Sequence, residues 1–126
     1  MPSFGTLKAD TLTHSTAGSL ATNFVVNGSL KAWFKLDGTG TIGGLDSFNI
    51  ASFTDNGTGD YSGTFTSAMG NANYAAVANT GSSDVFGSIA GGSQATTLVR
   101  VTAYFHSTSA KIDRDQVYTL VAGDLA

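Results

Sequence analysis

Apolar and polar residues alternate most clearly in the segment LKAWFKL, residues 30–36. One face of this segment carries Leu30, Ala32, Phe34 and Leu36. The opposite face carries Lys31, Trp33 and Lys35. Alternation with a period of two is typical of a β-strand that buries one face. We therefore expect a half-buried strand that ends at the turn Asp37–Gly40.

The next apolar run, residues 47–54, predicts a second strand. Its side chains divide into two sets, Phe48 and Ile50 on one side and Asn49, Ala51 and Phe53 on the other. The run continues into DNGTGD, residues 55–60, where Asn56-Gly57 is a strong hairpin signal because both residues tolerate positive φ. Residues 61–66 are then expected to return as the partner strand.

Four further strands are predicted over residues 71–79, 84–90, 96–106 and 116–122. The composition agrees, since the chain contains no Glu and is rich in Thr, Val, Phe, Tyr and Ser, which favour strands over helices. About seven short strands separated by turns are typical of an all-β domain. We expect an antiparallel β-sandwich or a jelly-roll-like domain over residues 30–126.

Residues 1–29 show no sustained periodicity and few aromatic side chains. We interpret them as an extended N-terminal arm used for attachment or assembly. At 126 residues the chain has the length of one domain.

Charge and composition argue against several classes of function and structure. Six scattered cations against nine Asp residues give a net charge of −3, which argues against a nucleic-acid-binding surface. No apolar run approaches the ~20 residues of a membrane span, so no membrane partner is expected. Cysteine is absent, which removes disulfides and thiolate metal sites.

The chemistry-bearing motifs are better explained as turns and surface loops. Residues 38–43 match GxGxxG, but another predicted strand follows instead of the helix that a dinucleotide site requires. Asp55 and Asp60 supply too few ligands for Ca²⁺. Asp113 and Asp115 lie among cations in KIDRDQ, which indicates a solvated loop with surface ion pairs. We predict no catalytic residue, no cofactor and no metal.

Trp33 lies on the predicted polar face between two lysines. It is either an interface anchor or part of a second core layer. The low charge leaves wide surfaces for subunit contacts, so self-association is expected. The candidate interface or ligand residues are Trp33, Asp55, Asn56, Tyr61 and Tyr74.

Two segments resemble bacteriophage proteins. TLKADTLTHSTAGS, residues 6–19, resembles the leader of small virion proteins of tailed phages. Residues 28–78 resemble a module that recurs in phage and prophage tail-fibre and related structural proteins. The matching positions are Lys31-Ala32-Trp33, Gly38–Thr41, Ser47, Asn49, Thr54–Tyr61, Phe65, Ala68-Met69 and Ala72–Ala75. The chain departs from the module at Gly43-Gly44 and Ser62-Gly63.

The resemblance implies a non-enzymatic, β-rich virion component, often a homotrimer, that assembles in the bacterial cytoplasm. The arm would then contact other virion proteins. A fibre-like or surface-attached role, with a part in host recognition, is the leading hypothesis. A capsid decoration (cement) protein that stabilises the head lattice is the first alternative. A module that binds host surface polysaccharide through exposed aromatics such as Trp33 or Tyr61 is a further one, and a glycan hydrolase using the aspartates is the weakest.

Overall fold

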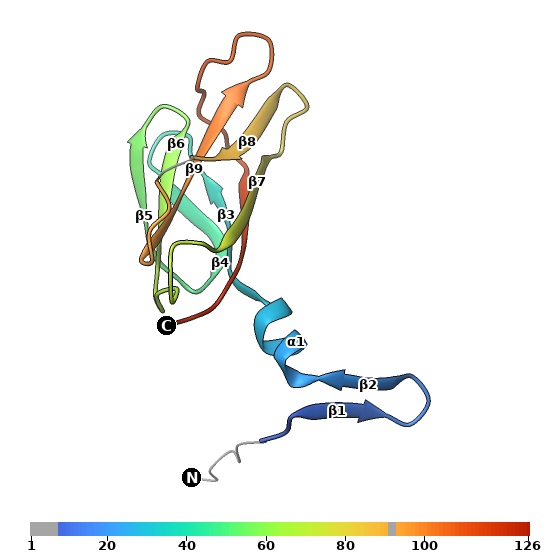
Figure 1. Cartoon of the computed structure of the whole chain (residues 1–126). Coiled ribbons are helices and arrows are strands. Elements are labelled where there is room, and N and C mark those ends of the chain that lie inside the picture. The colour runs from blue at the N-terminus through green and yellow to red at the C-terminus, as the bar shows by residue number, and fades with distance from the viewer. Residues whose placement is uncertain (1–7, 91–92) are drawn as a thin grey trace.

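The structure, a computed structural model, describes residues 8–90 and 93–126 (Figure 1). Strands make up most of the described chain, so the all-β prediction is confirmed. The arm contains β1 (Thr11–His14), β2 (Gly18–Ala21) and the short helix α1 (Thr22–Gly28). The remaining strands are β3 (Leu30–Asp37), β4 (Gly43–Phe48), β5 (Ile50–Gly57), β6 (Asp60–Phe65), β7 (Ala75–Thr80), β8 (Val85–Ile89), β9 (Leu98–Phe105) and β10 (Val117–Ala122).

Two four-stranded sheets form a sandwich. The first sheet has the strand order β4-β3-β10-β7, and the second has the order β5-β6-β9-β8. Every neighbouring pair is antiparallel. Eight strands therefore build the sandwich, one more than the sequence predicted.

The core lies between the two sheets. It is formed by buried side chains of both sheets and of the loops that join them: Ala32, Phe34, Leu36, Tyr61, Phe65, Met69, Tyr74, Val99, Val101, Val117 and Val121. Edge-to-face aromatic pairs cross it, with ring centroids 5.2 Å apart for Phe34–Phe53 and 5.7 Å apart for Phe65–Tyr74. This geometry is the favourable one for aromatic quadrupoles.

The alternation in β3 is confirmed for Ala32, Phe34 and Leu36, which are buried. Leu30 is the exception, since it lies at the start of the strand and is exposed. Lys31 was expected on a solvated face and is instead buried. Its aliphatic stem is covered because the ammonium group turns back to the end of α1 and donates hydrogen bonds there.

The predicted strand over residues 47–54 is wrong in its middle. Asn49 adopts φ 58°, which ends β4 and starts β5 in the other sheet. Its side chain stabilises this sharp connection: Nδ2 donates to the carbonyl oxygens of Lys31 (2.9 Å) and Ser67 (3.1 Å), and Oδ1 accepts from the Ser67 N–H (2.7 Å). Phe48 and Ile50 consequently belong to different sheets.

The hairpin predicted at residues 55–60 is present, between β5 and β6. The two residues between the strands are Thr58 and Gly59, however, and not Asn56-Gly57. Gly59 has φ 60°, and a Cβ there would lie 2.6 Å from the Ile112 amide nitrogen, so only glycine fits. The strands expected later in the chain are found as β7, β8, β9 and β10.

The arm carries more structure than expected. β1 and β2 form a hairpin, and α1 leads from it to the first sheet. Residues 1–7, the start of the predicted arm and part of the resembling leader, lie outside the described residues. α1 contributes no buried side chain, and the hairpin extends away from the sandwich (Figure 1). The described part of the arm thus contributes no side chain to the core.

Candidate assembly interface

Four large apolar side chains form a row across the outer face of the first sheet. The antiparallel register places Val77 opposite Leu120, Leu120 opposite Trp33, and Trp33 opposite Phe48. Directly opposite residues point to the same face of a sheet. We call Val77, Leu120, Trp33 and Phe48 the apolar row.

The apolar row is open to solvent in the single chain. Val77 is 63% exposed, Phe48 55% and Leu120 45%, while Trp33 is half-buried between its neighbours. Trp33 therefore lies outside the core, which excludes the second-core-layer interpretation. Contiguous exposed apolar surface of this kind is typical of protein–protein contacts.

A polar row borders the apolar row on the same face. The register places Asn79, Tyr118, Lys35 and Asp46 side by side. Lys35 lies over the Tyr118 ring, with 5.4 Å from Nζ to the ring centroid. An apolar centre with a polar border is the usual composition of an interface.

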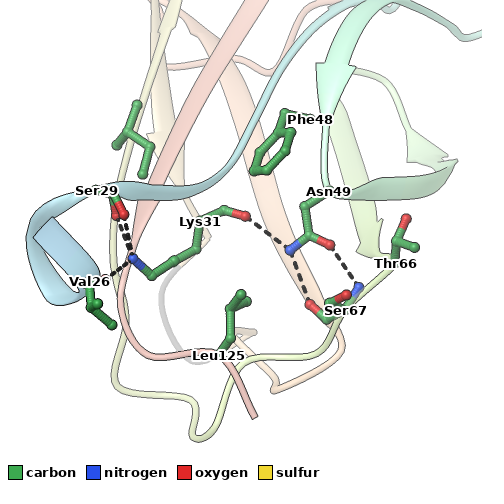
Figure 2. A pocket seen from close by; sticks show the side chains of 9 residues that line it. Val26, Ser29, Lys31, Phe48, Asn49, Thr66, Ser67 and Leu125 are labelled. Carbon is green, nitrogen blue, oxygen red and sulfur yellow. Dashed lines mark hydrogen bonds between the residues drawn. The ribbon is translucent and has the colours of Figure 1, made fainter. Parts of the chain in front are cut away.

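A groove of about 580 Å³ lies where the arm meets the sandwich (Figure 2). Its apolar walls are Val26, Leu30, Phe48 and Leu125, so Phe48 belongs both to the groove and to the apolar row. We call it the junction groove. Its polar side contains Lys31, whose Nζ donates to the Val26 carbonyl and to the Ser29 carbonyl (3.0 Å).

The arm adds a second set of exposed apolar side chains. They are Leu12, Leu20, Phe24, Val25 and Val26. Of the twelve large apolar residues that are exposed in the described chain, only Phe86 lies on the second sheet. Exposed apolar surface is thus concentrated on the arm, the first sheet and the adjacent C-terminal residue Leu125.

The outer face of the second sheet is mostly polar. One row across it is Thr54, Ser62 and Arg100, and the next is Asp60, Thr102 and Ser88. The exceptions are Leu98 and the pair Phe86–Tyr104, whose rings stack with centroids 5.6 Å apart. The two faces of the sandwich therefore present different chemistry to their surroundings.

Asp60 is the electrostatic centre of that polar face. Its carboxylate is 4% exposed and accepts two hydrogen bonds from Arg100, at 2.6 Å to Nε and 2.8 Å to Nη2, and one from Lys111. The Arg100 hydrogen bonds, aided by Lys111, lower the pKa of Asp60 below its usual value, against the opposing effect of burial. The same contact raises the pKa of Arg100.

The loop prediction for KIDRDQ is corrected by these contacts. Lys111 pairs with Asp60 and not with the aspartates of its own loop. Asp113 accepts hydrogen bonds from the Gly59 N–H (2.6 Å) and the Tyr61 hydroxyl (2.9 Å). Asp113 therefore fastens the loop to the β5–β6 hairpin, which is a structural role.

Two of the predicted interface or ligand residues are core residues. Tyr61 is fully buried and Tyr74 nearly so, because both side chains point between the sheets, and they are not available to stack on a sugar. Burial raises the pKa of both phenols, and for Tyr61 the hydrogen bond to Asp113 raises it further. The expectation that Tyr61 is an exposed aromatic is wrong, and Tyr74 does not lie on a surface where it could contact a partner or ligand.

Asp55 and Asn56 lie beside the β5–β6 turn. The Asp55 carboxylate accepts from the Gly57 N–H at 2.8 Å, and Asn56 Nδ2 donates to Ser62 Oγ at 2.8 Å. Asp55 and Asp60 thus bind different partners. Among residues 8–90 and 93–126, no group of three acidic, histidine or cysteine side chains converges as a metal site would require.

The residues missed by sequence reasoning are those that complete the apolar row and the arm surface. Leu120 alternates with buried residues in β10, and Val77 alternates with partly buried alanines in β7, so the outward direction of both follows from the pattern. Their position beside Trp33 depends on the order of the strands, which alternation does not specify.

No known protein family, curated protein or solved structure matches this chain. Within the described part of the chain, no helix has the length and apolar character needed to cross a membrane.

Proposed function

We propose that this chain is a non-enzymatic structural protein of a bacteriophage virion, a surface-attached or fibre-like β module that assembles with copies of itself into a homotrimer. The observation that carries the assembly part is the apolar row, four large side chains exposed together on one sheet face. The phage part is supported by the resemblance of residues 28–78 to tail-fibre and related modules.

The contacts of the aspartates favour a structural role over a glycan hydrolase. Asp60 is held by Arg100 and Lys111, and Asp113 is held by a backbone N–H and a tyrosine hydroxyl. A general acid needs a raised pKa near neutrality. The Arg100 hydrogen bonds lower the pKa of Asp60 instead.

The virion role is tested by counting this chain in purified phage particles by quantitative mass spectrometry and locating it by cryo-electron microscopy. A few copies at the tail support the fibre-like role. Hundreds of copies at threefold positions of the head would replace it with the decoration alternative. Absence from particles would refute both virion roles.

Self-assembly is tested separately by native mass spectrometry of the purified full chain. We expect trimers that dissociate when Leu120→Ser and Val77→Ser are combined in the apolar row. The matched control is Phe86→Ser, which removes a similarly exposed side chain from the other sheet. A wild-type chain that stays monomeric up to high concentration would refute self-assembly.

A second function, binding of host surface polysaccharide, is favoured by the Phe86–Tyr104 pair. These rings are stacked on an otherwise polar sheet face, beside the hydroxyls of Ser88 and Thr102. Sugars bind such aromatic platforms through their apolar ring faces. Binding to purified host polysaccharide that is lost in Phe86→Ala and kept in Phe48→Ala would support this function, and equal loss in both would contradict it.

A further inference from the structure

We propose that the arm of one copy packs against the apolar row and junction groove of a second copy. The inference rests on the proposed self-assembly and names the surfaces that meet. Two unpartnered apolar surfaces of the same chain carry it, one on the arm and one on the first sheet.

The arm lacks the contacts that would stabilise it by itself. α1 has seven residues and no buried side chain, and Phe24 on it is 66% exposed. Isolated helices shorter than about 12 residues are marginal in water, and so are isolated two-stranded hairpins. The apolar residues of the arm therefore require a partner surface.

The arm is built as one unit. The Thr22 hydroxyl donates to the Ala9 carbonyl at 2.7 Å, and the Thr22 N–H donates to the Asp10 carbonyl at 2.9 Å. These bonds join the start of α1 to the segment that leads into β1. A partner would accordingly receive the hairpin and the helix together.

The arm is also fixed in a direction that keeps it off its own sheet. Lys31 Nζ binds the carbonyls of Val26 and Ser29 and the Ser29 hydroxyl, which joins the end of α1 to the start of β3 (Figure 2). From this junction the hairpin runs away from the sandwich (Figure 1). A second copy can reach both surfaces, whereas the same chain would have to break the Lys31 contacts.

The two surfaces match in charge and size. The described arm carries Lys8 and Asp10, which cancel, and the polar row carries Lys35 and Asp46, which also cancel. Lys31 in the junction groove adds one positive charge to the receiving surface, which does not repel a neutral arm. Each contact of an arm with a row joins five large apolar side chains of one copy to four of another. At about half exposed each, these nine side chains bury on the order of 800 Å² in total, which is about half the area of a standard interface.

Because the arm and the row are different surfaces, the contact is heterologous. Repetition of such a contact closes into a ring when the rotation allows it. The proposed trimer is one such ring, with each copy giving an arm and receiving one.

The test uses two variants of the full chain. The arm variant combines Leu20→Ser with Phe24→Ser, and the row variant combines Val77→Ser with Leu120→Ser. All four side chains are exposed, so each variant is expected to keep the wild-type melting temperature when dilute. Each is expected to weaken association on the order of tenfold to a hundredfold. Phe86→Ser is the control on the second sheet.

Mixing the two variants gives the decisive result. The arm variant retains an intact row and the row variant retains an intact arm, so a mixture is expected to form mixed pairs that neither variant forms alone. Native mass spectrometry with one isotopically labelled variant measures these pairs.

The other outcomes separate this inference from the proposed function. If only the row variant loses association, rows pack on rows, so self-assembly stands and the arm contact is refuted. Loss in both variants without mixed pairs also refutes the arm contact alone. If both variants associate as the wild type does, the assembly surface proposed above falls as well.

Discussion

Replacing Asp60 with Asn tests whether this carboxylate stabilises the fold. The Asn side chain has nearly the same shape but no charge, and one oxygen acceptor is replaced by an amide donor facing Arg100 and Lys111. Both cations are held by Asp60 in the wild type, with Arg100 binding both carboxylate oxygens. We expect the variant to fold and to be less stable.

The magnitude follows from the exposure of the partners. Hydrogen bonds to charged groups contribute about 1.5–3 kcal/mol each when well buried. Arg100 and Lys111 are each more than a third exposed, so water can solvate both after the substitution. Each of the three contacts therefore contributes less to the free energy of unfolding than a fully buried contact would. The free energy of unfolding is expected to fall by about 2 kcal/mol, which lowers the melting temperature by roughly 8 °C.

The effect depends on pH in a defined direction. The pKa of Asp60 is lower in the folded chain than in the unfolded chain. The stabilisation is therefore complete above the unfolded pKa of ~3.9 and is lost as the pH falls through the folded pKa. The difference between wild type and Asp60→Asn should be full at pH 7 and should shrink progressively below about pH 4.

Urea unfolding followed by far-ultraviolet circular dichroism, at pH 7 and at low pH, measures both effects. The matched control is Asp115→Asn, which removes an exposed carboxylate. Two results would contradict a stabilising role of Asp60. One is an equal free energy of unfolding for Asp60→Asn and Asp115→Asn at pH 7. The other is a difference in stability between wild type and Asp60→Asn that does not change with pH.

Three further substitutions test the turn, the core and the sheet contact. Asn49→Ala should cost about 3 kcal/mol, since it loses three hydrogen bonds and puts Ala, which tolerates the left-handed region less well than Asn, at φ 58°, whereas Asn49→Gly loses only the bonds and should cost less. Tyr61→Phe should cost about 1 kcal/mol at pH 7. Because the pKa of Tyr61 is raised in the folded chain, the free energy of unfolding of the wild type decreases as the pH rises above ~10. This decrease should be smaller in the variant, which lacks the phenol hydroxyl. Gly87→Ala should cost about 1–3 kcal/mol, because its Cβ would lie 2.7 Å from the Asn79 backbone nitrogen, while Gly43→Ala, with open space, should not. Urea unfolding measures all three, and a Gly87→Ala variant as stable as Gly43→Ala would contradict the close contact.

The sequence was sufficient to predict the strands whose apolar residues alternate without interruption. In β3 the positions Ala32, Phe34 and Leu36 were predicted to face the core, and they do, because a strand in contact with a core must alternate. Asn49 could not be predicted as the point where the chain changes sheets, because it lies inside an apolar run that reads as one strand. Its left-handed conformation is stabilised by Lys31 and Ser67, which are each 18 residues away in sequence.

The candidate site was predictable only in part, for a similar reason. Trp33 could be identified because it interrupts a polar face within a single strand. Tyr61 could not be assigned to the core, because the residues around it, in DNGTGDY, indicate an exposed turn and its burial depends on packing between the sheets. The apolar row joins residues 33, 48, 77 and 120, which come together only when four strands pair in one order.

The two outer faces of the sandwich provide an internal comparison that bears on function. Both sheets are made by the same chain, and each needs apolar side chains only on the face that meets the core. The second sheet comes close to this requirement, because its central strands place mainly Ser, Thr, Asp and Arg outward, with Leu98 and the stacked Phe86–Tyr104 pair as the exceptions. The first sheet places Leu120, Trp33 and their neighbours outward instead, at a cost in solvation that the fold does not require. A surface that the fold does not need, and that an unpartnered apolar arm of the same chain can cover, supports the proposed assembly.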